Sequence, residues 1–459
     1  MSKKITSLKG MHIDQFMEII KDKQQLSVRS ARLIPLIKPG DEMALTSIFL
    51  SAVKLVKEFR DEIFTEVGLS RAGKVYVFTE VSFKELNNEQ PDGLIIVVGG
   101  GKIKDAALLE MKNKNSVLKE DQVQSYLAVA KKYDIKKFIT VSNQFVSSPT
   151  QSPLNVKPPR GVDLYHLSWS YILTKAHILL FKDRREKLHI KDDDQVEIMR
   201  EVVKYFDHEK SGVTGFTVMK KGWKTVTEKI RTGSAIKKSD PELIEAVSSW
   251  LEEERDMALM LSRELGVLVQ SGVKKFKNNL KGRQEFEAKS LLEGKSLSST
   301  LSVEDAASDV IVSACFDTRI VQMEVFLTPP DDKTNRGKIG WIRNQISTAQ
   351  KRNPEDFEKI ANELALYIYI KRQKVPEKVS LDKLEDAWED FKDVDIKEFG
   401  IRQVKSLGRN FEGVQRVVTD IETMLLSYYK GIVQYLKPWV NPAPKVPQKE
   451  ESKSLDNLD

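Results

Sequence analysis

The feature that most constrains the fold of this chain is a pair of short apolar runs joined by three consecutive glycines. The run GLIIVVGG covers residues 93–100, the run DAALLEMKN covers residues 105–113, and Gly99–Gly101 lie at the turn. Runs of this length and composition are typical of strands, and glycine supplies the positive φ angles that tight hairpin turns require. The segment therefore predicts a β-hairpin.

Apolar spacing predicts the elements around this hairpin. Apolar side chains recur every three or four residues in helices, whereas strands appear as short runs rich in β-branched and aromatic residues. On this basis the predicted helices are 11–26, 40–69, 119–134 and 170–182, and the further strands are 74–83, 136–145 and 162–169. The order helix, three strands, helix, strand, strand, helix indicates an α/β domain.

The remainder of the sequence predicts a helical region followed by a mixed one. Helical patterns continue from 192 to 268, and Asp240-Pro241 is a start signal for the long helix within this part. Two strands, 309–317 and 319–328, are predicted to form a hairpin, and a final helix is predicted at about 410–437. These patterns indicate a second region with its own helices and strands.

The chain has 459 residues, which is enough for two or three domains. The tail, 441–459, contains almost no large apolar residues and is expected to be disordered. The predicted organisation is an N-terminal helical extension (1–39), an α/β domain (40–185), a helical region (186–268), a C-terminal α+β domain (269–440) and the tail.

Composition indicates a folded protein that resides in the cytoplasm. Hydrophobic residues make up 40% of the chain and charged residues 31%. The formal net charge of +7 permits a nucleic-acid partner without requiring one, since affinity depends on local patches. Cys315 is the only cysteine, which excludes an intrachain disulfide and a thiolate zinc cluster, and we expect it to be buried. The sequence shows no signal peptide and no apolar run near the ~20 residues that cross a membrane.

Charged residues stand at the ends of the two hairpin strands. Asp92 comes directly before the first strand, and Glu110 and Lys112 lie near the end of the second. Alternate residues of a strand share a face, so Glu110 and Lys112 project to the same side. Pairing about the glycine turn puts position 92 opposite roughly 108–110. Two carboxylates at one point repel unless a cation joins them, and oxygen ligands suit Mg²⁺ or Mn²⁺.

The alternative for the same residues is a surface ion pair between Glu110 and Lys112, contributing about 0–1 kcal/mol to stability. In the metal-site hypothesis, the ammonium of Lys112 would instead orient a water or stabilise negative charge on a phosphate. The sequence favours the metal site.

This arrangement resembles the PD-(D/E)XK nuclease superfamily. The matching residues are Pro91-Asp92 and Glu110-Met111-Lys112, within the order helix, three strands, helix, strand. The resemblance implies a restriction-endonuclease-like core (α-βββ-α-β), here followed by the helical middle region and the C-terminal α+β domain. It implies Asp92, Glu110 and the Met111 backbone carbonyl as ligands of Mg²⁺ (or Mn²⁺), with Lys112 near the attacking water.

The next predicted helix extends the resemblance. Gln122 and Tyr126 are similar to the QxxxY motif of RecB-like members and lie one helical turn apart on one face. Members of the superfamily often add a glutamate from the first helix, for which Glu62 is the choice here, with Glu58 and Glu66 as rivals. The resemblance covers roughly residues 40–182.

The function that this resemblance implies is hydrolysis of DNA phosphodiester bonds, in the family's common setting of restriction or phage defence. The alternative is a non-catalytic DNA-binding or assembly subunit, and RNA is an alternative substrate. No membrane partner is expected, whereas a homo-oligomer or a partner protein stays open.

Other motifs give weaker signals. Gly99-Gly100-Gly101-Lys102 lacks the spacing of a Walker A loop and is interpreted as a turn. The five histidines show no ligand spacing, although His166 could border the active site. Ser142-Asn143-Gln144, at the end of a predicted strand, is either a polar pocket lining or a plain loop.

A basic segment follows the first part of the helical region. Lys220, Lys221 and Lys224 surround Trp223, a pattern that can neutralise phosphates and stack a base. The alternative is a solvated surface with Trp223 anchored in the core. Together with a nuclease-like domain, the segment is predicted to contact DNA.

Overall fold

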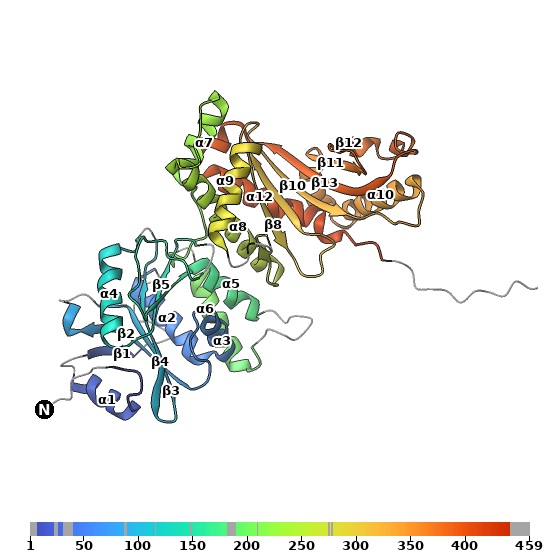
Figure 1. The fold of residues 1–459 in the computed structure, drawn as a ribbon. Coiled ribbons are helices and arrows are strands. Elements are labelled where there is room, and N and C mark those ends of the chain that lie inside the picture. Colours follow the sequence, from blue (N-terminus) through green and yellow to red (C-terminus); the bar gives the residue numbers. More distant parts are fainter. Residues whose placement is uncertain are drawn as a thin grey trace, which may run out of the picture. The chain divides into compact units, whose positions relative to one another are not determined.

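The computed structural model describes residues 7–22, 26–30, 40–86, 90–114, 116–146, 149–180, 190–208, 210–273, 276 and 279–440. The protein is a mixed α/β structure with two sheets (Figure 1). The chain forms two compact units, the first comprising Met1–Asp305, Asp309–Met323 and Val404–Leu426, and the second Ala306–Ser308, Glu324–Gln403 and Ser427–Asp459. The tail that was expected to be disordered, 441–459, lies outside the described residues.

The first unit contains a six-stranded sheet with the order β1-β2-β3-β4-β5-β6. Its strands are β1 (Leu26–Ser30), β2 (Lys74–Phe83), β3 (Gly93–Gly99), β4 (Lys102–Met111), β5 (Lys137–Ser142) and β6 (Asp163–Ser168). The strands from β1 to β4 pair antiparallel, whereas β5 pairs parallel with both β4 and β6. Strand β1 lies within 1–39, which was expected to be a helical extension only.

The glycine hairpin is confirmed. Gly99 pairs with Lys102, and the two turn residues Gly100 and Gly101 have φ angles of 60° and 73°. A side chain at either position would be strained in this left-handed conformation, which explains the glycines. Further along the ladder, Gly93 pairs with Leu109, and this register brings the start of β3 beside the end of β4.

Six helices belong to the same part of the first unit: α1 (Ile13–Asp22), α2 (Glu42–Leu55), α3 (Lys57–Glu66), α4 (Glu120–Lys132), α5 (Trp169–Leu180) and α6 (Asp193–Phe206). The prediction of one helix at 40–69 is wrong, because α2 and α3 are separated at Val56. The backbone of this fully buried residue is extended, with φ −104° and ψ 107°. Helix α2 begins at Asp41, whose side chain accepts hydrogen bonds from the backbone N–H groups of Met43 and Ala44.

Helices cover both faces of this sheet. On one face, Leu94 and Leu108 share a buried apolar cluster with Tyr126 of α4. On the other face, the backbone of Gly93 approaches Leu50 of α2 so closely that a Cβ there would lie 2.9 Å from Leu50 Cδ1. Helices therefore pack against both faces of the sheet around the β3–β4 hairpin.

The rest of the first unit is built around long helices. Its elements are α7 (Lys221–Thr232), α8 (Pro241–Leu265), α9 (Leu280–Gly294), β7 (Gln270–Ser271), β8 (Ser296–Ser302) and β9 (Val310–Cys315). Helix α8 begins at the predicted Pro241 and ends at Gly266, which adopts a left-handed conformation with φ 67°. Helix α9 was not among the helices predicted from the sequence. Cys315 is only partly buried.

The second unit contains α10 (Asn335–Arg352), α11 (Pro354–Ala361), β11 (Leu364–Ile370) and β12 (Glu377–Ser380). The chain passes between the units within β10 (Ile320–Leu327), β13 (Ile396–Ser406) and α12 (Arg416–Gly431). The second sheet has the order β12-β11-β13-β10-β9-β8-β7. Short 3-10 turns occur at Lys84–Leu86, Leu381–Lys383, Ala387–Glu389, Gly408–Glu412 and Val433–Tyr435. Within the described ranges, every helix is too short or too polar to span a membrane.

Candidate functional site

Three of the residues singled out in the sequence meet at the end of the β3–β4 hairpin. Lys112 Nζ lies 2.8 Å from Glu110 Oε1 and 4.0 Å from Asp92 Oδ2. The pairing of Gly93 with Leu109 produces this meeting, because it sets position 92 opposite position 110. The register deduced from the glycine turn is therefore the observed one.

A fourth residue, Glu42, joins the cluster from the first turn of α2. Its Oε1 lies 2.7 Å from Lys112 Nζ. Sequence reasoning looked for a first-helix glutamate further along and chose Glu62, but the carboxylate of Glu62 is engaged elsewhere, 2.7 Å from Lys175 Nζ. Its rival Glu66 also lies near Lys175, at 3.6 Å. The first-helix acid of this cluster is Glu42, and the missed signal was its place at the very start of the predicted helix.

Asp92 is fixed by the backbone of the neighbouring strand. Its Oδ2 accepts a short hydrogen bond, 2.6 Å, from the backbone N–H of Met111. The carbonyl of Met111, expected to be a metal ligand, accepts a hydrogen bond from Lys112 Nζ at 3.2 Å. Both polar groups of this one peptide residue thus face the cluster, which makes the backbone part of the site.

Burial has a strong effect on the two hairpin carboxyls. The side chain of Glu110 is 1% exposed, and its Oε2 has no hydrogen-bond partner. Burial, together with the neighbouring charge of Asp92, raises the pKa of Glu110 to about 8. Burial also raises the pKa of Asp92 to about 6, against the opposing effects of Lys112 and the Met111 N–H.

Lys112 keeps its proton in this environment. Burial by itself lowers its pKa, but the charges of Asp92 and Glu110 outweigh that effect and raise the pKa above the usual value for lysine. With all groups ionised, three carboxylates face one ammonium. The cluster therefore carries a surplus of negative charge that Lys112 alone does not neutralise.

The donor set of the cluster consists of oxygen atoms around Lys112. In the described part of the chain, no group of three or more His, Cys, Asp or Glu side chains is already arranged around one metal position. In this cluster it is the ammonium of Lys112 that contacts the carboxylates of Glu42 and Glu110. A cation at this place would have to share the oxygens with Lys112 or displace it.

Gln122 and Tyr126 form a pair on α4, as their spacing predicts. Gln122 Nε2 donates a hydrogen bond of 2.9 Å to the hydroxyl of Tyr126, and the ring of Tyr126 packs against Phe138. Tyr126 shares its buried cluster with Leu108, which is on the same strand face as Glu110. The pair therefore lies on the side of the sheet to which Glu110 points.

Asn113 is a site residue that sequence reasoning missed. Its side chain is buried, and its Nδ2 donates to the carbonyls of Gly40, at 3.0 Å, and Ser211, at 3.2 Å. Because Gly40 leads directly into α2, this contact ties the start of that helix to the residue after Lys112. The indole N–H of Trp169 donates to the carbonyl of Lys112 at 2.8 Å and fixes the same segment. A lone asparagine after a strand carries no sequence signal for such a role.

His166 is a structural residue. It is fully buried, with Nδ1 2.9 Å from Thr140 Oγ1 and Nε2 2.8 Å from the carbonyl of Gln144. Burial lowers the pKa of His166 to about 4, so its imidazole is neutral at physiological pH. Its contacts hold strands β5 and β6 and the following loop together, so its side chain has a structural role here.

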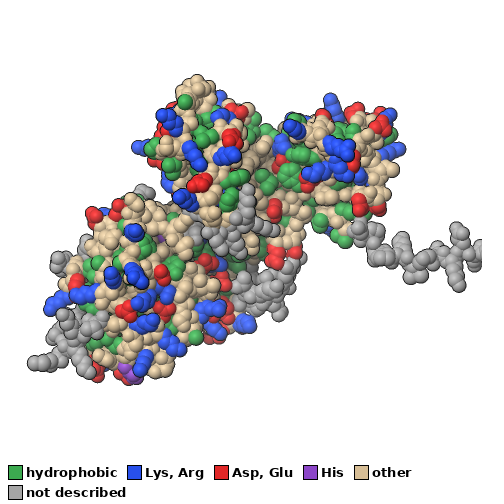
Figure 2. Space-filling view, in the orientation of Figure 1, with side chains coloured by type: hydrophobic (Ala, Val, Ile, Leu, Met, Phe, Trp, Pro, Cys, Tyr) green, Lys and Arg blue, Asp and Glu red, His purple; other side chains and the backbone are tan. Residues whose placement is uncertain are grey.

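The basic segment before and within α7 does not form a stacking platform. Trp223 is fully buried, and its indole N–H donates to the carbonyl of Phe411 at 2.8 Å, so the ring is not accessible to a base. Lys220 is paired with Glu252 at 2.6 Å, whereas Lys221 and Lys224 are exposed. On the face shown in Figure 2, basic and acidic side chains are interspersed. The prediction that Trp223 stacks on a base is therefore wrong, and the alternative, a tryptophan anchored in the core, is confirmed.

Comparison with known proteins assigns no relationship to this chain. No family model matches the sequence, and no curated protein or solved structure shows significant similarity. Any statement about function therefore has to come from the site itself.

Proposed function

We propose that this chain is a metal-dependent nuclease that hydrolyses phosphodiester bonds in DNA. The observation that carries the proposal is the meeting of Asp92, Glu110 and Glu42 around Lys112 at the end of one hairpin. Buried charge costs free energy, so three carboxylates gathered at one strand end, with Glu110 buried, are more typical of a site of chemistry than of a stabilising contact.

The order of elements supports the same proposal. Two helices precede three antiparallel strands, which are followed by α4 and a strand that pairs parallel with β4. This order is compatible with the α-βββ-α-β core that the sequence resemblance implies. It supports the proposal because a short acid-and-lysine pattern alone is a weak signal.

The donor chemistry of the cluster suits a small divalent cation, although among the described residues the carboxylates are arranged around Lys112 and not around one metal position. All donors in the cluster are oxygens, which Mg²⁺ and Mn²⁺ prefer, and the buried Glu110 Oε2 lacks a hydrogen-bond partner. Asp92, Glu110 and Glu42 would hold the ion, which would supply Lewis-acid polarisation of a phosphate oxygen. Since the pKa of Glu110 is about 8 without a cation, this carboxyl has to lose its proton before both of its oxygens can act as ligands.

Each of the chain's own site residues would then have a separate role in the reaction. Asp92 would be held in one orientation by the Met111 N–H, which binds its Oδ2. Lys112 is protonated because of the raised pKa, and this favours a role in orienting water and stabilising phosphate charge over a role as general base. Gln122 and Tyr126 would support the site from α4.

The alternative is a non-catalytic DNA-binding or assembly subunit. It is favoured by one observation: Lys112 contacts two of the three carboxylates directly, so the cluster is partly compensated without any metal ion. In this case the four residues would form a structural ion-pair network, and nucleic acid would contact exposed basic residues such as Lys221 and Lys224.

Cleavage of plasmid DNA separates the two proposals. The wild-type chain is expected to cut in the presence of Mg²⁺ and to stop when EDTA is added, and the variants Asp92→Ala and Lys112→Ala are expected to be inactive. Equal residual cleavage by all three proteins would indicate a contaminating nuclease. That result would favour the non-catalytic alternative. Offering RNA in the same assay determines which polymer is the substrate.

A further inference from the structure

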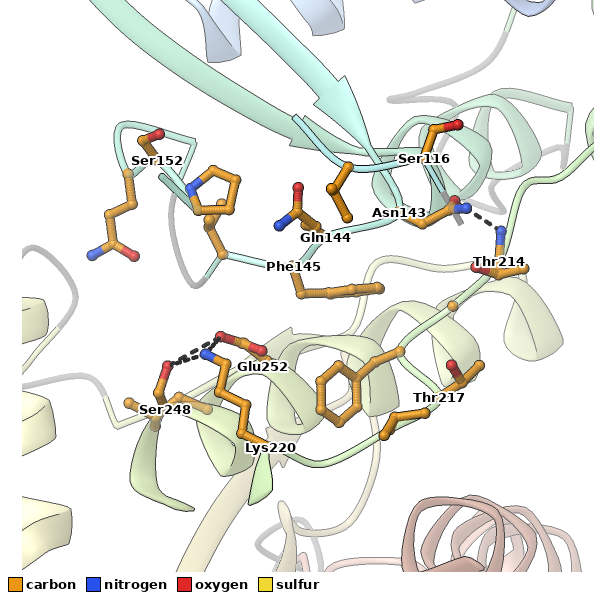
Figure 3. A pocket seen from close by; sticks show the side chains of 18 of the residues that line it. Ser116, Asn143, Gln144, Phe145, Ser152, Thr214, Thr217, Lys220, Ser248 and Glu252 are labelled. Carbon is orange, nitrogen blue, oxygen red and sulfur yellow. Dashed lines mark hydrogen bonds and ion pairs between the residues drawn. The ribbon is translucent and has the colours of Figure 1, made fainter. Parts of the chain in front are cut away.

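A pocket of about 780 Å³ opens in the first unit beyond the end of β4. Its walls come from the segments that follow β4 and β5, from residues 214–220, and from α8. Figure 3 shows Gln144 and Phe145 on one side and Lys220, Ser248 and Glu252 on the other. Of the two interpretations of Asn143 and Gln144, a polar pocket lining or a plain loop, the structure supports the pocket lining.

The walls of the pocket combine an apolar surface with hydrogen-bonding groups. Phe145 and Phe216 meet edge to face, with ring centroids 5.9 Å apart, and form part of the apolar lining. Lys220 Nζ contacts Ser248 Oγ at 2.9 Å and Glu252 Oε1 at 2.6 Å, opposite the amide of Gln144. A planar ligand with polar atoms along its edge matches these walls, and nucleobases are ligands of this kind.

Hydrogen bonds fix one wall of the pocket. Asn143 Nδ2 donates to the carbonyl of Gly212 at 2.7 Å, and Asn143 Oδ1 accepts from the N–H of Thr214 at 3.0 Å. Further along, the N–H of Phe216 donates to Asp256 Oδ2 at 2.6 Å. Residues 212–216 are thereby fixed to both β5 and α8, so the walls form a preorganised site and do not depend on a ligand for their order.

The pocket begins beside the proposed hydrolytic site. Lys114 lines it and follows Lys112 by two residues, so the two backbones are at most about 7 Å apart. The charged side chains in the lining are Lys114, Lys220 and Glu252, and Lys220 is already paired with Glu252. Among the described residues, Lys114 takes part in no ion pair, and it lies at the end of the pocket closest to the cluster, where a phosphate would lie.

From this arrangement we propose that the pocket receives an unpaired base of the nucleic-acid strand whose backbone lies along Lys112 and Lys114. This inference rests on the proposed nuclease function and makes it more specific. The substrate would be a single strand, or a duplex from which one nucleotide is turned out next to the phosphate that is attacked. Gln144 would contact the edge of the base, and Lys114 would contact the backbone.

Binding of three labelled oligonucleotides tests this proposal. They are a fully paired duplex, a duplex with one unpaired nucleotide, and the same duplex with an abasic residue at that position, each measured by fluorescence anisotropy in EDTA. The wild-type chain is expected to bind the unpaired base about tenfold more tightly than the abasic form, a typical effect of one accommodated base. The variant Thr217→Trp, which fills the pocket from an exposed position, should abolish this ratio.

Two further variants make the test specific. Gln144→Ala should reduce the base-to-abasic ratio, whereas Ser239→Trp, a substitution at an exposed position outside the pocket lining, should leave it unchanged. Thermal unfolding of each variant verifies that it is folded. Equal affinity of the wild-type chain for the base and abasic forms would overturn the inference, as would tight binding of free nucleoside monophosphates without a preference on the strand.

Failure of the base-binding proposal can be distinguished from failure of the proposed nuclease function. Cleavage of plasmid DNA in Mg²⁺ is measured separately and does not enter the binding ratio. If the chain prefers the unpaired base but never cleaves, the proposal of a base-binding pocket stands and the proposal of hydrolysis fails. If the chain cleaves DNA without a preference for the unpaired base, the proposal of hydrolysis stands and the proposal of a base-binding pocket fails.

Discussion

Each unit of this protein contains a buried glutamate on a strand with a cation 2.8 Å away, but the two surroundings differ. In the second unit, Glu324 of β10 contacts Arg402 Nη2 at 2.8 Å and accepts a hydrogen bond from the Tyr369 hydroxyl at 3.0 Å. In the first unit, Glu110 of β4 contacts Lys112 at 2.8 Å, yet its Oε2 has no hydrogen-bond partner. Both carboxylate oxygens of Glu324 thus have a partner, whereas only one oxygen of Glu110 does.

The neighbouring charges explain this contrast. Glu324 has Arg402 and a neutral hydroxyl beside it, so its cluster is balanced and matches a structural ion pair. Glu110 shares one ammonium with Asp92 and Glu42, so its cluster carries excess negative charge. A pair of opposite charges inside a protein is thus weak evidence for function, whereas unbalanced buried charge indicates a role beyond stability.

The largest effect that this comparison predicts is on cleavage. Glu110→Gln preserves the size of the side chain but removes its charge, and we expect the rate of Mg²⁺-dependent DNA cleavage to fall by about 10³-fold. The matched variant Glu324→Gln should leave that rate within about twofold, because its cluster has no excess charge. Initial rates on supercoiled plasmid measure both, and comparable losses in the two variants would contradict the contrast.

The next largest effect is on the stability of the second unit. Arg402→Met removes the cation that balances Glu324, and breaking a buried pair in this way should lower the free energy of unfolding by about 3 kcal/mol. The double variant Glu324→Gln, Arg402→Met should recover part of this loss, since no buried charge is left unpaired. Urea unfolding checks both values. Full stability of the single variant would show that Arg402 does not compensate Glu324.

Much of the six-stranded sheet could be predicted from local patterns. The glycine turn determined the register of β3 and β4, and that register in turn brought Asp92 to Glu110. The strand at 74–83 was predicted to the residue because its alternation and its borders are local signals. The meeting of the three hairpin residues needed no information from the rest of the chain.

Predictions failed where distant segments decide the outcome. Glu42 reaches Lys112 because α2 begins just after Gly40, which Asn113 holds by a hydrogen bond, and no periodicity encodes such a contact. Trp223 looked like a base-stacking residue among lysines, but it packs against Phe316 and Phe411, far away in the sequence. Burial of a single aromatic side chain depends on these long-range partners.

A smaller effect should appear in the pH dependence of stability. The pKa of Glu110 in the metal-free folded state is about 8, above the ordinary value of 4.5. The folded state therefore keeps a proton that the unfolded state loses, so the stabilisation is present below about pH 4.5 and is lost as the pH rises through about 8. In EDTA, the free energy of unfolding should decline over this window by at most about 5 kcal/mol, since each pKa unit corresponds to about 1.4 kcal/mol.

Two comparisons isolate the contribution of Glu110 to this decline. The variant Glu110→Gln should make the pH profile shallower between about 5 and 8, since one titrating carboxyl is gone and only the smaller contribution of Asp92, whose pKa is about 6, is left. Addition of Mg²⁺ to the wild-type chain at pH near 8 should restore stability, because a bound cation favours the ionised form. A wild-type profile that Mg²⁺ leaves unchanged at saturating concentration would argue against a metal site in this cluster.

The smallest effect distinguishes the two candidate first-helix acids. Glu42 touches Lys112 from a position 30% exposed, and so its charge is partly screened by solvent. Glu42→Gln should therefore lower the cleavage rate by about tenfold, which corresponds to ~1.4 kcal/mol of transition-state stabilisation. Glu62→Gln, which breaks the contact with Lys175 instead, is the matched control and should leave the rate unchanged. The reverse result would mean that the active cluster is assembled around Glu62 when nucleic acid binds, with Glu42 serving only to hold Lys112 in the free protein.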